Sequence, residues 1–196
     1  MEESIIVFKG QDKLSAGPVS EVAKYLKSLV DQGDAPNYLI FKSSNGQQID
    51  FDLGGSETDV EQRYGSSKHA SLADSAADTP PKTRGRPKLG VVGREVTLLP
   101  RHWEWLDRQR GGSSAALRRL IDAERKNNAD EDRVRIAQDS TNRFIYAMAG
   151  NLAGFEEAVR ALYAGDKAGF AQHIRSWPAD IKQCTIDFAR DAFDET

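Results

Sequence analysis

Residues 96–126 read VTLLPRHWEWLDRQRGGSSAALRRLIDAERK, and the pattern of side chains changes three times along them. The β-favouring run 96–99 is followed by Pro100, which the first turn of a helix tolerates. Gly111-Gly112 then ends that helix, and Ser113-Ser114 can cap the next one. The stretch therefore predicts a strand, a helix, a tight glycine turn and a second helix.

This predicted strand-helix-helix module has too few apolar residues to close a core of its own. Trp103 and Leu106 are expected to point inward from the first helix. The second helix has an apolar face and an outward basic set. The apolar face comprises Leu117, Leu120 and Ile121, and the basic set comprises Arg118, Arg119, Arg125 and Lys126. A unit of this size needs a partner, most simply a second copy of the chain.

The charge of the chain is unevenly distributed. Its 196 residues have a formal net charge of −3, yet residues 82–126 contain 12 Lys and Arg against 5 Asp and Glu, a surplus of seven positive charges. The remaining residues therefore carry a net charge of −10. A basic segment of this kind is expected where a protein contacts a polyanion, although basic solvated helices also occur without one.

The stretch from Val96 to Lys126 resembles the ribbon-helix-helix family of DNA-binding proteins in its element order, its proline-started helix and its Gly-Ser turn. The resemblance implies that two chains pair their strands into an antiparallel ribbon that enters the major groove. It also implies that the second helix holds a DNA phosphate at its N-terminus, where free backbone N–H groups attract anions. Ser113, Ser114 and Arg118 are the candidate residues there.

Two registers are open for the predicted strand, because two leucines precede the proline. In one register Val96 and Leu98 are buried, and Glu95 and Thr97 then face the groove. In the other register Arg94 and Val96 face it. Arg94 and Thr97 are the favoured base contacts, because arginine reads guanine well and threonine is versatile, whereas a glutamate repels nearby phosphates. The plainer alternative is a helical hairpin that follows a strand.

A basic arm precedes this strand. Residues 83–90 read TRGRPKLG, and Arg84 to Pro87 resembles the core of the AT-hook, a short motif that lies in the A·T-rich minor groove. Pro87 biases Arg86 toward an extended backbone, and the narrow groove attracts arginine. Arg84, Arg86 and Lys88 are therefore candidate DNA contacts.

Residues 1–54 are predicted to form a small β-α-β-β unit. The helix begins near Gly17-Pro18, and Ser44-Asn45-Gly46 is typical of a hairpin turn. The expected strands are 5–8, 38–41 and 49–53. Such a unit is marginal by itself, so we expect it to pack on another domain or a second subunit.

The rest of the chain separates into a linker and a helical region. Residues 55–81 have few large apolar side chains and are expected to be a flexible linker before the basic arm and module of residues 82–128. Residues 129–196 have apolar side chains three or four positions apart, which predicts a bundle of three or four helices. The fold class expected is therefore α+β.

Nearly the full length of the chain also resembles a bacterial domain of unknown function family, number 2239. The resemblance rests on Ser15 to Pro18, on the stretch GRPKLGVVGREVTLLPRHWEWL and on SWPADI at Ser176 to Ile181. It implies no established activity.

Catalysis is not expected from this sequence. His69, His102 and His173 are scattered, and Cys184 is the single cysteine, expected to be a buried, inert thiol. No metal or cofactor site is expected. The apolar runs are too short to cross a bilayer, so we expect a cytoplasmic protein without a membrane partner.

Together these patterns predict a dimeric bacterial DNA-binding protein with a role in transcription regulation. Its partners would be DNA and a second copy of itself. The alternative is a non-catalytic interaction or scaffold protein that uses the strand-helix-helix segment for dimerisation.

Overall fold

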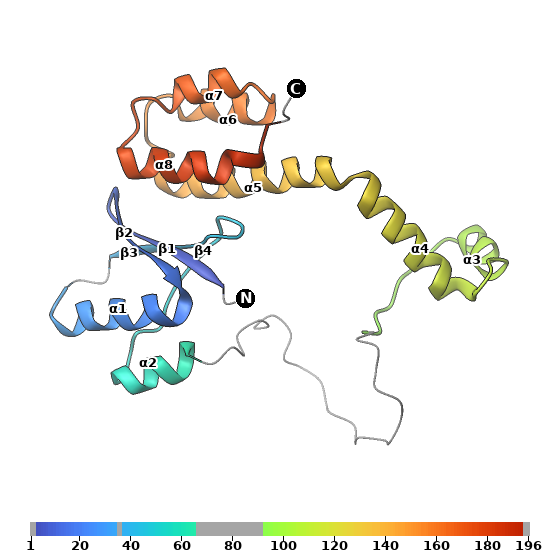
Figure 1. The fold of residues 1–196 in the computed structure, drawn as a ribbon, viewed down its shortest axis with the longest axis horizontal. Coiled ribbons are helices and arrows are strands. Elements are labelled where there is room, and N and C mark those ends of the chain that lie inside the picture. Colours follow the sequence, from blue (N-terminus) through green and yellow to red (C-terminus); the bar gives the residue numbers. More distant parts are fainter. Residues whose placement is uncertain (1–2, 35–36, 66–91, 194–196) are drawn as a thin grey trace. The chain divides into compact units, whose positions relative to one another are not determined.

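The computed structural model describes residues 3–34, 37–65 and 92–193 (Figure 1). The chain divides into two compact units. Unit 1 combines residues 1–71 with residues 130–196, and unit 2 comprises residues 72–129. An antiparallel sheet at the N-terminus and helices in the rest of the chain give the mixed α+β class that the sequence predicts.

The sheet of unit 1 has four antiparallel strands in the order β2-β1-β3-β4. They are β1 (Ser4–Lys9), β2 (Asp12–Pro18), β3 (Tyr38–Lys42) and β4 (Gln48–Ile49). The sequence predicts β1, β3 and a longer β4 but misses β2, whose large apolar side chain is Leu14 alone. Pairing along β1 holds β2 in place, with a register shift opposite Val7/Phe8. The element order is therefore β-β-α-β-β.

Helix α1 (Val19–Asp31) covers one face of this sheet. It begins directly after Pro18, as the Gly-Pro pair predicts. Val22 and Leu26 of α1 pack with Ile5, Val7 and Ile40 of the strands. Because side chains alternate along a strand, Phe8 and Phe41 are directed to the opposite face.

Helix α2 (Glu57–Tyr64) lies inside the stretch that the sequence predicts as a linker, and for these residues that prediction is wrong. Local signals explain the helix. Ser56 and Asp59 form a capping box, and Val60 is fully buried although the helix is polar overall. The Tyr64 ring stacks on Phe51 with centroids 4.5 Å apart. Residues 66–81, including His69, lie outside the described residues.

The C-terminal part forms the helical bundle that the sequence predicts. Its helices are α5 (Ala129–Ala149), α6 (Phe155–Tyr163), α7 (Lys167–His173) and α8 (Ala179–Phe188), followed by a 3₁₀ turn at Ala189–Asp191. The expected punctuation is confirmed at two places. Asp166 caps α7 by accepting a hydrogen bond from the Gly169 N–H, and Pro178 directly precedes α8.

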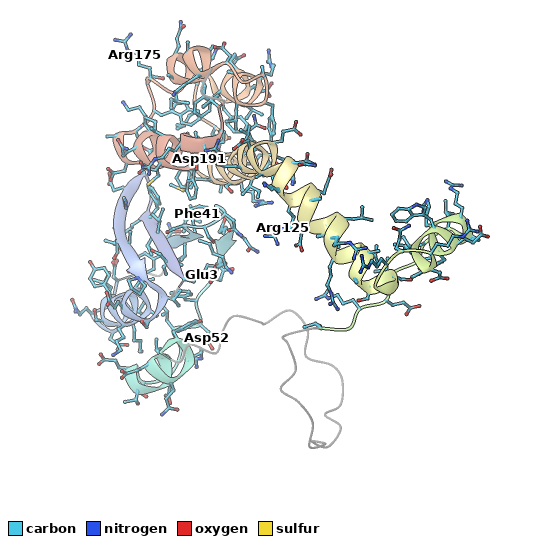
Figure 2. All side chains as sticks on the ribbon, turned by 45° about the vertical axis from the view of Figure 1, so that its right-hand side comes forward. Glu3, Phe41, Asp52, Arg125, Arg175 and Asp191 are labelled. Atoms are coloured by element: carbon cyan, nitrogen blue, oxygen red, sulfur yellow. The ribbon has the colours of Figure 1, made fainter. Side chains whose placement is uncertain are left out.

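The sheet and these helices share one core. Phe144 of α5 lies 5.6 Å from Phe8 and 5.1 Å from Phe41, measured between ring centroids. Figure 2 shows Phe41 on the side of the sheet that faces the C-terminal helices. At the sheet edge, the Lys13 N–H donates to the Asp180 carboxylate at 2.8 Å. The small N-terminal unit thus obtains, from its own chain, the cover that its size requires.

Candidate nucleic-acid interface

Unit 2 contains the helical part of the predicted module. Helix α3 (Pro100–Asp107) has proline at its start, and α4 (Gly112–Asn127) follows after a four-residue turn. Leu99, directly before α3, has an extended backbone. Residues 92–99 belong to no strand in the described chain. A strand whose hydrogen-bonding partner is a second chain has no ladder in one copy, so the ribbon stays a prediction.

The turn between the two helices depends on left-handed glycines. Gly111 and Gly112 have φ values of +88° and +78°, a region that other residues rarely adopt. Gly111 itself is the residue that caps α4. The prediction that Ser113 or Ser114 provides the cap is therefore wrong. The helix begins at Gly112, so both serines lie inside its first turn.

The hydroxyl groups of these serines contact charged side chains instead. Ser113 Oγ donates to Asp107 Oδ1 at 2.8 Å, and Arg118 donates to Ser114 Oγ at 3.1 Å. Arg119 donates to the carbonyl oxygen of Arg110 at 3.1 Å. The start of α4 thus has two guanidinium groups beside it and one carboxylate. The sequence did not single out Asp107 or Arg110, since only the fold of the turn brings them to α4.

An open apolar pocket of about 260 Å³ lies between α3, α4 and the segment before α3. It is lined by Leu98, His102, Trp105, Leu106, Leu117 and Leu120. Among residues 92–129, the part of unit 2 that the structure describes, the buried side chains are Leu106 and Ala116. The other apolar side chains are only partly covered, as expected for a unit whose core is completed by a partner.

The sequence places Trp103 inward with Leu106, but 38% of Trp103 is exposed. On the two-turn helix α3, Leu106 occupies the buried position, and the described residues of unit 2 cover the indole of Trp103 only in part. Leu120 and Ile121, expected on the buried face of α4, are about half exposed in this single copy, at 49% and 55%.

The pocket also bears on the strand register. Leu98 lines it, whereas Leu99 is half exposed. If residues 94–98 alternate as a strand does, Thr97 lies on the face opposite Leu98 and Arg94 on the same face as Leu98. This geometry favours the register in which Thr97 faces the groove. Val96 is 56% exposed.

The described part of unit 2 carries eight exposed cationic side chains and five exposed acidic ones. The cationic residues are Arg94, Arg101, Arg108, Arg110, Arg118, Arg119, Arg125 and Lys126; Figure 2 labels Arg125 on α4. The other four positive charges of the basic segment, Lys82, Arg84, Arg86 and Lys88, lie outside the described residues. The candidate minor-groove contacts Arg84, Arg86 and Lys88 are therefore not placed by the structure.

Among the residues that the structure describes, no three His, Cys, Asp or Glu side chains gather closely enough to hold a metal ion. Cys184 is a free, buried thiol, as expected, and burial raises its pKa. No helix in the described ranges is long and apolar enough to cross a membrane.

A family described as "Uncharacterized protein conserved in bacteria (DUF2239)" matches residues 4–189, nearly the whole chain. The chain belongs to this family. The match covers both units, so the sheet, the α3–α4 module and the C-terminal helices are all parts of the family domain. Neither the curated proteins nor the solved structures contain a match to the chain.

Proposed function

We propose that this DUF2239 protein is a dimeric, non-enzymatic DNA-binding protein of the bacterial cytoplasm, with transcription regulation as its role. The observation that supports this proposal most is the combination found in unit 2. An open apolar pocket, which a second copy would cover, lies on the same short helix pair as eight exposed cationic side chains. A positively charged module completed by pairing is suited to a two-fold symmetric polyanion such as duplex DNA.

In the proposed complex, different residues have different tasks. Two copies of segment 94–99 pair as a ribbon in the major groove, where Thr97 contacts base edges. Arg94, on the other face of a regular strand, would reach the groove only through its length or a bulge. The backbone N–H groups at Ser113 and Ser114 hold a phosphate together with Arg118, which lies 3.1 Å from Ser114 Oγ.

The arm contributes a second mode of contact in this proposal. Arg84 and Arg86 enter the minor groove and Lys88 contacts the backbone, with a preference for A·T-rich sequence. Phosphate contacts fix the position of the protein without reading sequence, so Lys88 and α4 raise affinity on all duplexes, whereas Arg84 and Arg86 add the A·T preference.

A second candidate function follows from the same apolar surface. If unit 2 serves only to join two copies, the chain is an interaction or scaffold protein, and its charges are those of a solvated face. The half-exposed Trp105, Leu120 and Ile121 favour association under either proposal.

The two functions are separated by binding of the purified full-length chain to fluorescently labelled A·T-rich and mixed duplexes. We expect binding at low ionic strength that weakens steeply as salt is added, because bound cationic groups release counterions from DNA. Arg118→Ala should weaken binding to all duplexes, whereas Arg160→Ala, an exposed arginine of α6 in unit 1, should have no effect. If the chain binds neither duplex at any ionic strength, DNA binding is refuted and the scaffold function is the one that remains.

A further inference from the structure

The turn that joins β3 to β4 contains the dipeptide Asn45-Gly46, a sequence prone to spontaneous loss of its side-chain amide. In this reaction the Gly46 backbone nitrogen attacks Cγ of Asn45. Its proton passes to a solvent base, and the Cγ–Nδ2 bond breaks to release ammonia and leave a succinimide ring. Water then opens the ring at either carbonyl group, which gives an aspartate or an isoaspartate. Glycine favours the attack because it lacks the Cβ that obstructs ring closure.

In the folded hairpin both reacting groups of this dipeptide have hydrogen-bond partners. The Gly46 N–H, whose nitrogen is the nucleophile, donates to the carbonyl oxygen of Lys42 at 2.9 Å. The side-chain oxygen of Asn45, on the carbon that is attacked, accepts the Gln47 N–H at 3.0 Å. Because the attacking nitrogen must lose its proton, the bond to Lys42 opposes the first step.

Packing on α5 holds the same dipeptide from the other side. Gly46 is buried, and a Cβ at this position would overlap the Ser140 carbonyl oxygen of α5. The Asn45 carbonyl oxygen accepts a hydrogen bond from Arg143 of the same helix at 3.2 Å. The peptide group between Asn45 and Gly46 is thus fixed at both ends, its carbonyl by Arg143 and its N–H by Lys42. Ring closure turns this peptide group, so the hairpin has to leave α5 before the ring can form.

We propose that Asn45-Gly46 is a latent self-modification site, which the native hairpin protects and which reacts when the hairpin leaves α5. Either product adds a carboxylate to the turn. The isoaspartate also inserts a methylene into the main chain between Lys42 and Gln47, where a backbone hydrogen bond of 2.9 Å closes the turn. The modified turn no longer matches α5, so a transient opening becomes permanent. The site belongs to unit 1, and its chemistry does not rest on DNA binding.

Peptide mapping of the full-length chain by mass spectrometry measures this reaction. The chain is incubated in mildly alkaline buffer in its native state and, in parallel, unfolded in guanidinium chloride, which gives the unprotected rate at the same site. We expect the peptide that contains Asn45 to lose its amide at least about tenfold more slowly in the native chain, because only molecules with an opened hairpin react. Equal rates in the native and the unfolded chain would overturn the proposal.

Arg143→Ala removes the bond to the Asn45 carbonyl oxygen and leaves the dipeptide itself intact. It should raise the native rate about two- to tenfold, as expected for the loss of one hydrogen bond, and leave the rate in the unfolded chain unchanged. Arg133→Ala is the matched control, since Arg133 is an exposed arginine of α5 whose ion pair with Asp130 lies within that helix. If Arg143→Ala reacts no faster than Arg133→Ala, α5 does not protect the turn and the proposal is overturned.

Discussion

The hairpin turn between β3 and β4 offers the sharpest test of the shared core of unit 1. Gly46, with φ of +66°, lies against the backbone of α5, and a Cβ on this residue would overlap the Ser140 carbonyl oxygen. The neighbouring Asn45 carbonyl oxygen accepts a hydrogen bond from Arg143 of α5 at 3.2 Å. Gly46→Ala therefore forces the sheet and α5 apart as well as straining the turn.

Gly10→Ala is the matched control for this substitution. Gly10 lies in the β1–β2 turn at a nearly identical φ of +62°, and nothing is within 4 Å of its Cβ position. Left-handed backbone costs an alanine about 1–2 kcal/mol in either turn. Overpacking adds about 1–3 kcal/mol at Gly46 only, because a backbone carbonyl cannot rotate away as a side chain can. We therefore expect the free energy of unfolding to fall by about 2–5 kcal/mol in Gly46→Ala and by about 1–2 kcal/mol in Gly10→Ala.

Denaturant unfolding followed by circular dichroism measures both values on the full-length chain. A larger loss of unfolding free energy in Gly46→Ala than in Gly10→Ala supports a hairpin packed on α5, provided that the denaturant dependence of this free energy is unchanged. Equal losses in the two variants would refute the reasoning, since the hairpin would then be free of the C-terminal helices.

Three further results are expected from unit 1. Phe144→Ala, which removes the ring that packs on both Phe8 and Phe41, should lower the free energy of unfolding by about 3–5 kcal/mol in the same assay. The Cys184 thiol should react with a thiol reagent only after unfolding, because burial raises its pKa and blocks access; rapid labelling of the native chain would contradict this. Burial and the hydrogen bond to Asp34 raise the pKa of Tyr38 from 10.0 to about 12. The neutral phenol therefore stabilises the fold fully below pH 10, and its contribution to the free energy of unfolding is lost as the pH rises through about 12. Tyr38→Phe should remove a tyrosine ionisation near pH 12 from an ultraviolet absorbance titration.

Much of the architecture follows from local patterns in the sequence. Pro18 and Pro178 mark helix starts, and Asp166 marks a cap, because each acts through its own backbone or its nearest neighbours. The apolar run at residues 5–8 likewise predicts strand β1. These features depend on short-range geometry, which a single sequence displays directly.

Other features depend on contacts between distant residues and could not be predicted in this way. Strand β2 has little apolar content and is held by pairing along β1. Helix α2 has one buried residue, Val60, and packs on α1, which lies much earlier in the chain. Phe8 and Phe144 meet across most of the chain, and no periodicity links them.

In the candidate site, too, the features set by local sequence were predictable and those set by the path of the folded chain were not. The proline-started helix, the glycine turn and the second helix of unit 2 were predicted from sequence and are confirmed. The contacts of Ser113 with Asp107 and of Ser114 with Arg118 depend on the exact path of the turn, so sequence reasoning assigned both serines to capping. The predicted ribbon requires a second chain and stays a prediction.

We propose that two copies of this chain join through unit 2 and bind duplex DNA. Sedimentation of the full-length chain, with and without labelled duplex and over a range of salt concentrations, tests both parts in one measurement. We predict a dimer of the free protein and a dimer–duplex complex that dissociates as salt is raised. A free chain that stays monomeric, or a duplex that sediments alone even at the lowest ionic strength, would contradict the account.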